Sequence, residues 1–283
     1  MIAAQAPGIV RLDCGPMQMT IIAQGSNGPL TEIAQQAAAY AMQLLAELAA
    51  HQHIAARTQQ ELPGNDAWPA VLQQMITAVR RSGDPTLTPM AAVAGTIADL
   101  TADWLMARGA VKAIVNNGGD IAVRLAGIQT TKVGIAPALG SQATHTLTLD
   151  AGRGIGGIAT SGLGGRSFTK GIASAAMAAA GTASLADACA TSLANATYVE
   201  HPAVKVAWAE QLDPNTDICG HQVVQAVGLL PPAVVEQALM AGWTRAAELV
   251  RQGLIAGAAI FVQQQLVMIP ENFIMAIGGG GRR

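Results

Sequence analysis

The sequence is poor in the residue types that mark several common classes of protein. Aromatic residues make up only 3% of the 283 residues, charged residues make up 12%, and the formal net charge is −2. Because the basic residues are few and scattered, we expect no nucleic-acid partner held by a basic surface. The three cysteines, Cys14, Cys189 and Cys219, are far apart and show no CxxC spacing. A disulfide framework or a zinc site is therefore not indicated, and a reducing compartment fits.

Long apolar runs are also missing. Hydrophobic residues reach 51% of the chain, but the alanine-rich stretches are interrupted by Gly, Ser, Thr and Asp. No stretch of about 18 strongly apolar residues, the length a membrane-spanning helix needs, is present. The opening residues "MIAAQAPGIV" lack the basic segment of a secretory signal. We therefore expect a cytoplasmic protein with no membrane contact, and its alanine-rich surface would allow a homodimer.

What the sequence does contain is an alternation of helical and extended patterns. Period-two segments predict a hairpin within 8–25, arms of a second hairpin on either side of Asn117–Gly118, and strands at 131–137, 144–150 and 256–269. Strong helix formers and end signals predict helices at 31–51, 68–83 and 88–109, one from Ser184 and one from Pro232. Interleaved helices with hairpins favour an α+β fold with mixed, largely antiparallel sheets packed with helices.

The ends of two helices carry recognisable signals. Thr31 stands where the first helix would be capped. Thr88, Pro89 and Gly109 bound the third helix as N-cap, first-turn residue and stop.

The chain shows no clear linker, so we expect one domain over residues 1–283. Within it, residues 1–87 would hold the N-terminal hairpin and helices, 88–200 the motif-bearing core, and 201–283 the C-terminal helix and strand.

One carboxylate stands out in the stretch "SLADACATSLANAT", residues 184–197. Asp187 and Thr191 are four residues apart, so on a helix both oxygens project from one face, a turn apart. The spacing allows two interpretations. Ser184 and Asp187 could form a capping box, with the carboxylate reaching back to the N–H of the cap. Alternatively, Asp187 and Thr191 could supply two hard oxygens to Mg²⁺.

Two further stretches invite a functional interpretation. In "IVNNGGDI", residues 114–121, Asn117–Gly118 is a hairpin signal, but Asp120 opens the next strand, where Asp is disfavoured. The glycine-rich span 152–165 would let a ligand approach the backbone closely. Its "GRGIGG" at 152–157 has the GxGxxG spacing, yet it follows a strand and precedes no predicted helix. It is therefore a weak dinucleotide signal.

Three stretches, in this order, carry a resemblance to a known family: "AAVAGTIADLTADWLMARGAVKAIVNNGGDI" (91–121), "GIATSG" (157–162) and "ADACATSLANA" (186–196). Together they resemble the ApbE-like family, the FAD:protein FMN transferases, and are closer still to a poorly characterised branch of that superfamily. The resemblance implies an ApbE-like, T-fold-related architecture. It also implies an enzyme that uses Mg²⁺ and takes FAD as ligand or substrate.

Carried over position by position, the resemblance assigns roles to individual residues. It places Mg²⁺ on Asp187, Thr191 and a backbone carbonyl near Ala91. The cleft for the flavin nucleotide would include Asn116, Gly118, Gly119, Asp120, Thr160, Ser161 and Gly162.

The chain departs from the family pattern at two places. The family's lysine falls on Ala94, and its histidine-containing stretch is replaced by "GLGGRSFTKG", residues 162–171. This segment supplies Arg166, Ser167 and Lys170, which would hold an anionic ligand instead. We therefore expect Asp187, Thr191, Arg166 and Ser167 to carry any chemistry, with Lys170 on the ligand.

Three functions stay open on the sequence alone. The first is transfer of FMN from FAD to a protein. The second is an enzyme acting on a small anionic or heterocyclic metabolite without flavin. The third is a flavin- or metabolite-binding protein without turnover.

Overall fold

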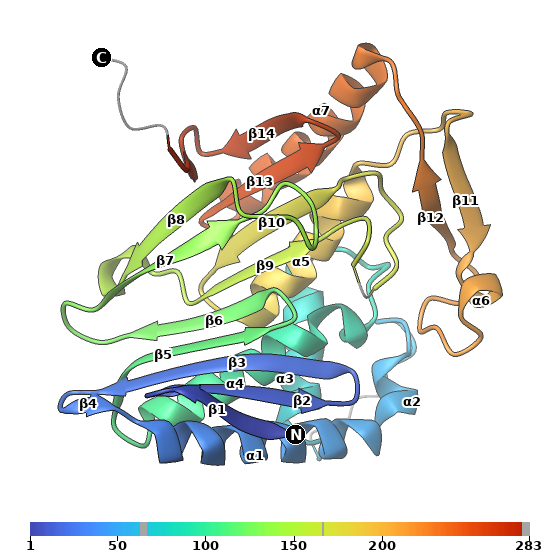
Figure 1. Ribbon diagram of the computed structural model, residues 1–283. Helices are drawn as coiled ribbons and strands as arrows, with labels where there is room; N and C mark the ends of the chain where they lie inside the picture. Colours follow the sequence, from blue (N-terminus) through green and yellow to red (C-terminus); the bar gives the residue numbers. More distant parts are fainter. Residues whose placement is uncertain (63–66, 166, 279–283) are drawn as a thin grey trace. The chain divides into compact units, whose positions relative to one another are not determined.

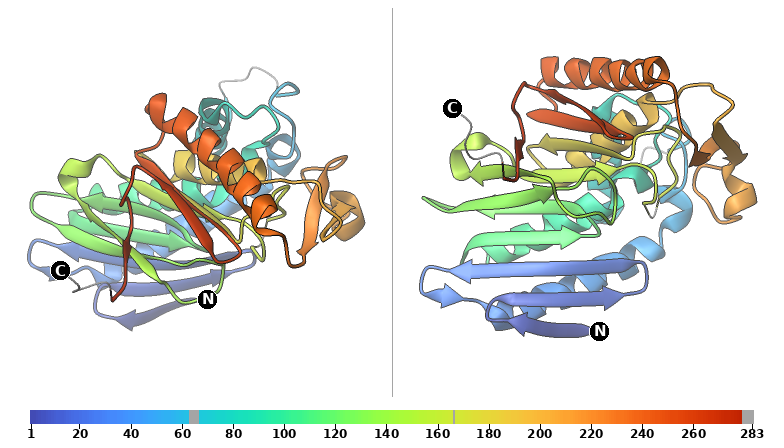
Figure 2. Two further views of the ribbon diagram at one scale, coloured as in Figure 1. Left: turned by 90° about the horizontal axis from the view of Figure 1, so that it is seen from above. Right: turned by 45° about the horizontal axis from the view of Figure 1, so that its top comes forward.

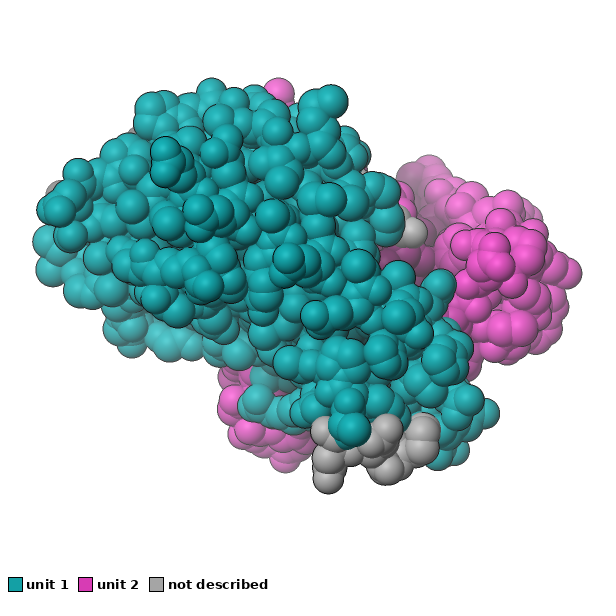
Figure 3. Space-filling model, turned by 90° about the horizontal axis from the view of Figure 1, so that it is seen from below, with its two compact units in different colours: residues 1–131, 150–159, 179–188 teal, residues 132–149, 160–178, 189–283 magenta. Residues whose placement is uncertain are grey.

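The computed structural model describes residues 1–62, 67–165 and 167–278. Helices alternate with largely antiparallel sheets, so the α+β class predicted from the sequence is confirmed. The chain forms two compact units, coloured separately in Figure 3. Unit 1 holds residues 1–131, 150–159 and 179–188, and unit 2 holds 132–149, 160–178 and the chain from 189 onward. That the whole chain acts as a single domain stays a prediction.

Unit 1 is built on an antiparallel sheet. Its strands follow one another in the order β1 (Ile2–Ala6), β2 (Ile9–Cys14), β3 (Met17–Gly25), β5 (Ala110–Asn117) and β6 (Asp120–Leu125), as Figure 1 shows. The short β4 (Gly28–Pro29) pairs with β3. Alternate residues of β3, from Met17 to Ala23, are buried, which is the period-two pattern of a strand with one face on the core.

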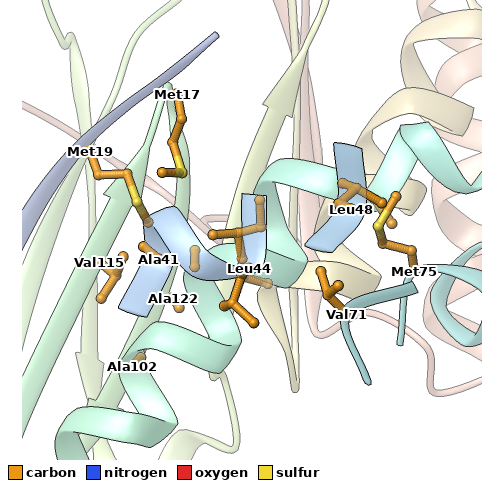
Figure 4. Packing of buried hydrophobic residues seen from close by; sticks show 14 of the residues in the cluster. Met17, Met19, Ala41, Leu44, Leu48, Val71, Met75, Ala102, Val115 and Ala122 are labelled. Carbon is orange, nitrogen blue, oxygen red and sulfur yellow. The ribbon is translucent and has the colours of Figure 1, made fainter. Parts of the chain in front are cut away.

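Helices cover one face of this sheet. Helix α1 (Thr31–Ala49) packs on β1 to β3, and α4 (Val93–Met106) packs on β5 and β6 and on α1 (Figure 2). Helix α3 (Ala70–Ser82) and the 3₁₀ turn η1 (Pro89–Ala92) lie against each other and against α4, and the short α2 (Gln52–Ala55) contacts α1. Small buried residues of α1 such as Ala41 let the layers approach closely, and Met19, Leu44 and Met75 fill the remaining space (Figure 4).

Unit 2 contains the remaining sheets. Strands β7 (Thr130–Ile135), β8 (His145–Asp150) and β15 (Met275–Ala276) form one sheet, and β11 (Val204–Trp208) pairs with β12 (Gln222–Val227). The hairpin of β13 (Gly257–Val262) and β14 (Gln265–Ile269) is packed against α7 (Pro232–Arg251), and the short α6 (Ala209–Leu212) contacts β11. The chain passes between the units within β7 and β8, and again within β9 (Gly157–Ser161), β10 (Ala175–Ala180) and α5 (Ala183–Ala196).

Several local predictions need correction. Thr31 does not cap α1 with its side chain; its hydroxyl accepts the N–H of Gly8 at 2.8 Å. Thr88 precedes η1, but its side chain makes no cap hydrogen bond there. The turn between β5 and β6 consists of Gly118 and Gly119, both with positive φ, one position later than the Asn-Gly signal suggested. The closing strand is two strands, β13 and β14. None of the helices in the described ranges is long and apolar enough to cross a bilayer.

Candidate functional site

Asp187 lies on α5 and makes its hydrogen bond to another helix. Its Oδ2 accepts the backbone N–H of Gly95, on the first turn of α4, at 2.9 Å. A side chain at residue 95 would prevent this approach, since a Cβ there would lie 2.3 Å from the carbonyl oxygen of Ala183 and 2.9 Å from the Cβ of Asp187. Gly95 is therefore the residue that allows α4 and α5 to meet at the carboxylate.

The capping-box interpretation of Ser184 and Asp187 is wrong. Helix α5 begins at Ala183, and the hydroxyl of Thr182 accepts the N–H of Leu185 at 3.3 Å. The N–H of Ser184 is bound by Asp99 of α4 at 2.8 Å, so Ser184 stands inside the helix and is not its cap. The Asp187 carboxylate is thus not used as a local cap.

The environment of Asp187 disfavours its negative charge. Burial raises the pKa of the Asp187 carboxyl well above its usual range, and the nearby Asp120 carboxylate raises it further, while the N–H groups of Gly95 and Ala94 oppose the shift. The guanidinium of Arg124 does not relieve this, because it pairs with Asp99 at 2.9 Å and with Asp103 at 2.6 Å. Two neighbouring carboxylates whose charges repel are a place where a cation would be stabilised.

The β5–β6 turn is tied to the start of α4. The side-chain amide of Asn117 donates to the carbonyl of Ala94 at 3.2 Å, and the Oδ1 of Asn116 accepts the N–H of Gly119 at 2.9 Å. These bonds hold Asp120, the first residue of β6, at the end of the sheet that faces the N-terminal turn of α4. Within unit 1 the structure therefore brings together most of the predicted residues of the "NNGGD" stretch with Asp187.

The oxygens available to a cation are of the hard type. Ala91, whose carbonyl was expected to join the site, lies half-buried in η1 just before α4, and Thr191 lies half-buried one turn beyond Asp187 on α5. The Thr191 hydroxyl makes no hydrogen bond to any described residue. Among the described residues no group of three or more His, Cys, Asp or Glu side chains could hold a metal. A cation here would thus rely on carboxylate, hydroxyl and carbonyl oxygens together with oxygens of its ligand, a set that suits Mg²⁺.

Unit 2 contains a pocket of about 380 Å³ beside the glycine-rich segment. Its walls are formed by Gly162–Gly165, Ser167–Thr169, Leu212 and Val224–Val227. Backbone bonds fix the segment, since Leu163 N–H donates to Ala173 O and Val224 N–H donates to Thr169 O, both at 2.9 Å. Gly162 has φ +150°, and a Cβ there would lie 2.8 Å from Ala173 O, so the position needs glycine.

The residues predicted to hold a ligand in this part of the chain differ in their relation to the pocket, and Gly162 is one that lines it. Ser167 is exposed and lines it, whereas Thr160 and Ser161 are the half-buried last residues of β9 and are not part of its wall. Lys170 follows the wall segment and is half-buried, with its backbone N–H on the Asn195 side chain at 2.9 Å. Arg166 lies outside the described residues.

Residues that act across elements could not be recognised from the sequence pattern. Asp99, Gly95 and Arg124 gave no separate signal, because their partners lie far along the chain. His221 is a second case in unit 2. Burial lowers the pKa of its imidazole and the charge of Lys170 lowers it further, against an opposing effect of Glu210, so the neutral form of this histidine is favoured.

The chain is therefore an α+β protein with a pair of carboxylates at a helix–helix contact in unit 1 and a glycine-lined pocket beside a short sheet in unit 2. The model of the family described as AbpE bacteria matches residues 2–268, so the chain belongs to this family within the ApbE-like superfamily. The family resemblance stated from the motifs is thereby confirmed.

Relatives and a solved structure agree with this assignment. A UPF0280 protein of Methanosphaerula palustris is 33% identical over 178 residues, which cover 60% of this chain and 70% of the relative. A UPF0280 protein of Methanococcoides burtonii is 37% identical over 158 residues, 56% of this chain and 64% of that protein. The match to a UPF0280 protein of Methanosarcina acetivorans spans 54% of that protein. The chain therefore spans only about half to two thirds of the Methanococcoides burtonii and Methanosarcina acetivorans proteins. The crystal structure of the Pseudomonas stutzeri flavinyl transferase ApbE, apo form, has a TM-score of 0.52 at 13% identity and covers 95% of this chain and 94% of its own. It shows the fold alone.

Proposed function

We propose that this chain binds a flavin nucleotide together with Mg²⁺ and transfers FMN from FAD to an acceptor protein. The observation that carries the proposal is the placement of Asp187, whose Oδ2 is oriented by the Gly95 N–H at 2.9 Å beside the carboxylate of Asp120. The match to the AbpE bacteria family and the fold shared with a flavinyl transferase support it.

The residues present fit Mg²⁺. Hard oxygen donors dominate the site, and with few protein ligands the remaining positions of an octahedral shell are left for water and for phosphate oxygens of a substrate. Asp187, Thr191 and the carbonyl near Ala91 would hold the ion, with Asp120 facing it. When bound, Mg²⁺ would neutralise charge on the pyrophosphate of FAD.

The chain's own groups would then bind and orient the nucleotide. The Gly95 N–H orients the Asp187 carboxylate by bonding its Oδ2, and a carboxylate oxygen would face the cation. Unit 2, taken by itself, has a pocket with apolar walls and with Ser167 and Thr169 as hydrogen-bonding groups, which would suit a heterocycle. In the transfer, an acceptor threonine oxygen bonds to the phosphorus of the FMN half and the pyrophosphate bond breaks. AMP leaves, and the hydroxyl proton passes to a base or to solvent.

The test is direct. Purified protein is incubated with FAD, Mg²⁺ and an acceptor protein bearing a flavinylation threonine, and covalent flavin and AMP are measured. We expect both products in equal amounts, none with a chelator, and none with Asp187→Asn. Absence of AMP with the wild-type chain would count against flavin transfer.

A second candidate is a reaction on a small anionic or heterocyclic metabolite. It is favoured by Ala94, which stands where the family has lysine, and by the cation Lys170 beside the pocket segment. Thermal-shift measurements separate the two functions: stabilisation by FAD with Mg²⁺ supports the first, and stabilisation by small organic acids alone supports the second.

A further inference from the structure

Asp99 is a buried carboxylate with an unusually complete set of partners. Its Oδ1 accepts the N–H of Ala183 at 2.9 Å and pairs with the Arg124 guanidinium at 2.9 Å. Its Oδ2 accepts the N–H of Ser184 at 2.8 Å and a side-chain N–H of Gln74 at 3.3 Å. A buried charge is tolerated only when it is paired and hydrogen-bonded in this way.

Two of these partners are the first N–H groups of α5. The N–H groups of a helix's first turn have no partner inside the helix, and a carboxylate there is also favoured by the helix dipole. In most helices the residues just before the first turn supply such a cap. Here the Thr182 hydroxyl does so by accepting the N–H of Leu185. Asp99 comes instead from the middle of α4, so its bonds fix where the start of α5 lies relative to α4.

The contact between α4 and α5 has a second point one turn away. Gly95 precedes Asp99 by four residues on α4, and its N–H donates to Asp187, four residues after Ala183 on α5. Gly157 of β9 packs directly against the backbone of Ala183, since a Cβ at residue 157 would lie 2.1 Å from the Ala183 nitrogen. The first turn of α5 is therefore held by charge on one side and by close backbone contact on the other.

We propose that Asp99 is a positioning residue for the Asp187 carboxylate, acting through the first turn of α5. This inference rests on the proposed cation site at Asp187. Asp99 itself does not face the cation, because both of its oxygens are occupied by α5, Arg124 and Gln74. Without the Asp99 carboxylate the first turn of α5 is no longer fixed relative to α4. The hydrogen bond from the Gly95 N–H, which orients the Asp187 carboxylate, is then weakened.

The variant to make is Asp99→Asn, which preserves the shape but places an amide NH₂ against a backbone N–H or the guanidinium. Asp103→Asn is the matched control, because Asp103 also pairs with Arg124 yet is 56% exposed at its side chain and caps nothing on α5. Mg²⁺ affinity is measured by calorimetry, and hydrogen exchange of the Gly95 amide is measured by NMR. Thermal unfolding verifies that each variant is folded.

We expect Asp99→Asn to weaken Mg²⁺ binding at least tenfold and to speed exchange of the Gly95 amide, with Asp103→Asn within twofold of wild type in both. Wild-type affinity and exchange in folded Asp99→Asn would overturn the inference, and so would faster exchange with unchanged affinity. If the wild-type chain itself does not bind Mg²⁺, the proposed function fails, and the Gly95 amide alone then decides the positioning role.

Should Asp99→Asn not fold, Gln74→Ala gives the same test in milder form. It removes the neutral donor that bridges Asp99 and Ser184, at 3.3 Å from each, and leaves the ion pair in place. A two- to fivefold loss of Mg²⁺ affinity with faster Gly95 exchange is expected, and no change in either would overturn the inference.

Discussion

The decisive feature at the scale of single residues is a carboxylate whose surroundings favour its protonated form. The folded-state pKa of Asp187 is raised by burial and by Asp120, so the folded protein binds this proton more tightly than the unfolded chain does. The stability that this gives is full below the unfolded carboxyl pKa of about 4. It is lost as pH rises through the folded pKa.

Asp187→Asn should therefore stabilise the metal-free protein at pH 8 and have little effect at low pH. The amide oxygen of the new side chain still accepts the Gly95 N–H, while the unfavourable charge is gone. Urea unfolding across a pH series measures this, and Asp120→Asn should shift the curve in the same direction by less. A wild-type midpoint that does not fall relative to that of Asp187→Asn as pH rises would disprove the argument.

Substitutions of Thr191 test whether its hydroxyl binds the cation. Its hydroxyl has no hydrogen-bond partner among the described residues, so removing it should cost little stability. Thr191→Val should weaken Mg²⁺ binding by about tenfold, or ~1.4 kcal/mol, whereas Thr191→Ser retains the oxygen and should stay close to wild type. Calorimetric titration with Mg²⁺ compares the three proteins, and equal affinities for the Val and Ser variants would remove Thr191 from the site.

At the scale of secondary-structure elements, the α4–α5 contact depends on Gly95. Alanine in a helix is normally favoured over glycine by about 1 kcal/mol, but a Cβ here would lie 2.3 Å from a backbone oxygen. Overpacking of this kind costs about 3 kcal/mol, so Gly95→Ala should destabilise the protein by about 2 kcal/mol in denaturant unfolding. Gly181→Ala, whose Cβ would have its nearest neighbour 3.9 Å away, is the control and should change stability by no more than about 0.5 kcal/mol. Equal stabilities of the two variants would refute the close contact.

The sequence predicts the elements well where the signals are local. The hairpin of β2 and β3, the helix ending at Gly83 and the Pro-initiated α7 all follow from spacing and turn residues within a few positions. Predictions failed where a distant partner replaced the local one. The cap of α5 is such a case, because the Asp99 carboxylate accepts the N–H of Ser184. No residue within α5 indicates that this partner comes from α4.

The site was predictable in the same uneven way. Asp187 and Asp120 stand out in the sequence by their places in a helix and at the start of a strand, and Asn116 enters through the family resemblance. The structure brings these three residues together in unit 1, whereas Asn117 was predicted only as part of the turn. Gly95 and Arg124 were not found, because a glycine in a helix and an arginine in a strand acquire their roles only through tertiary contacts. His221 and Lys170 approach each other in unit 2 across some fifty positions of sequence, which no spacing pattern could indicate.

At the scale of the whole molecule, binding should appear as added stability. A ligand that binds only the folded state raises the free energy of unfolding by about 1.4 kcal/mol for each tenfold increase above its Kd. FAD with Mg²⁺ should therefore raise the melting temperature progressively with concentration, and FAD with a chelator should raise it less. Identical shifts with and without Mg²⁺ would separate flavin binding from the cation.

Whether Asp187 holds a divalent cation can be seen in anomalous diffraction from a crystal soaked with Mn²⁺, a stand-in for Mg²⁺. We expect a single strong anomalous peak about 2 Å from a carboxylate oxygen of Asp187, present in the wild type and missing in Asp187→Asn. A crystal that binds Mn²⁺ elsewhere, with no peak at Asp187, would contradict this expectation.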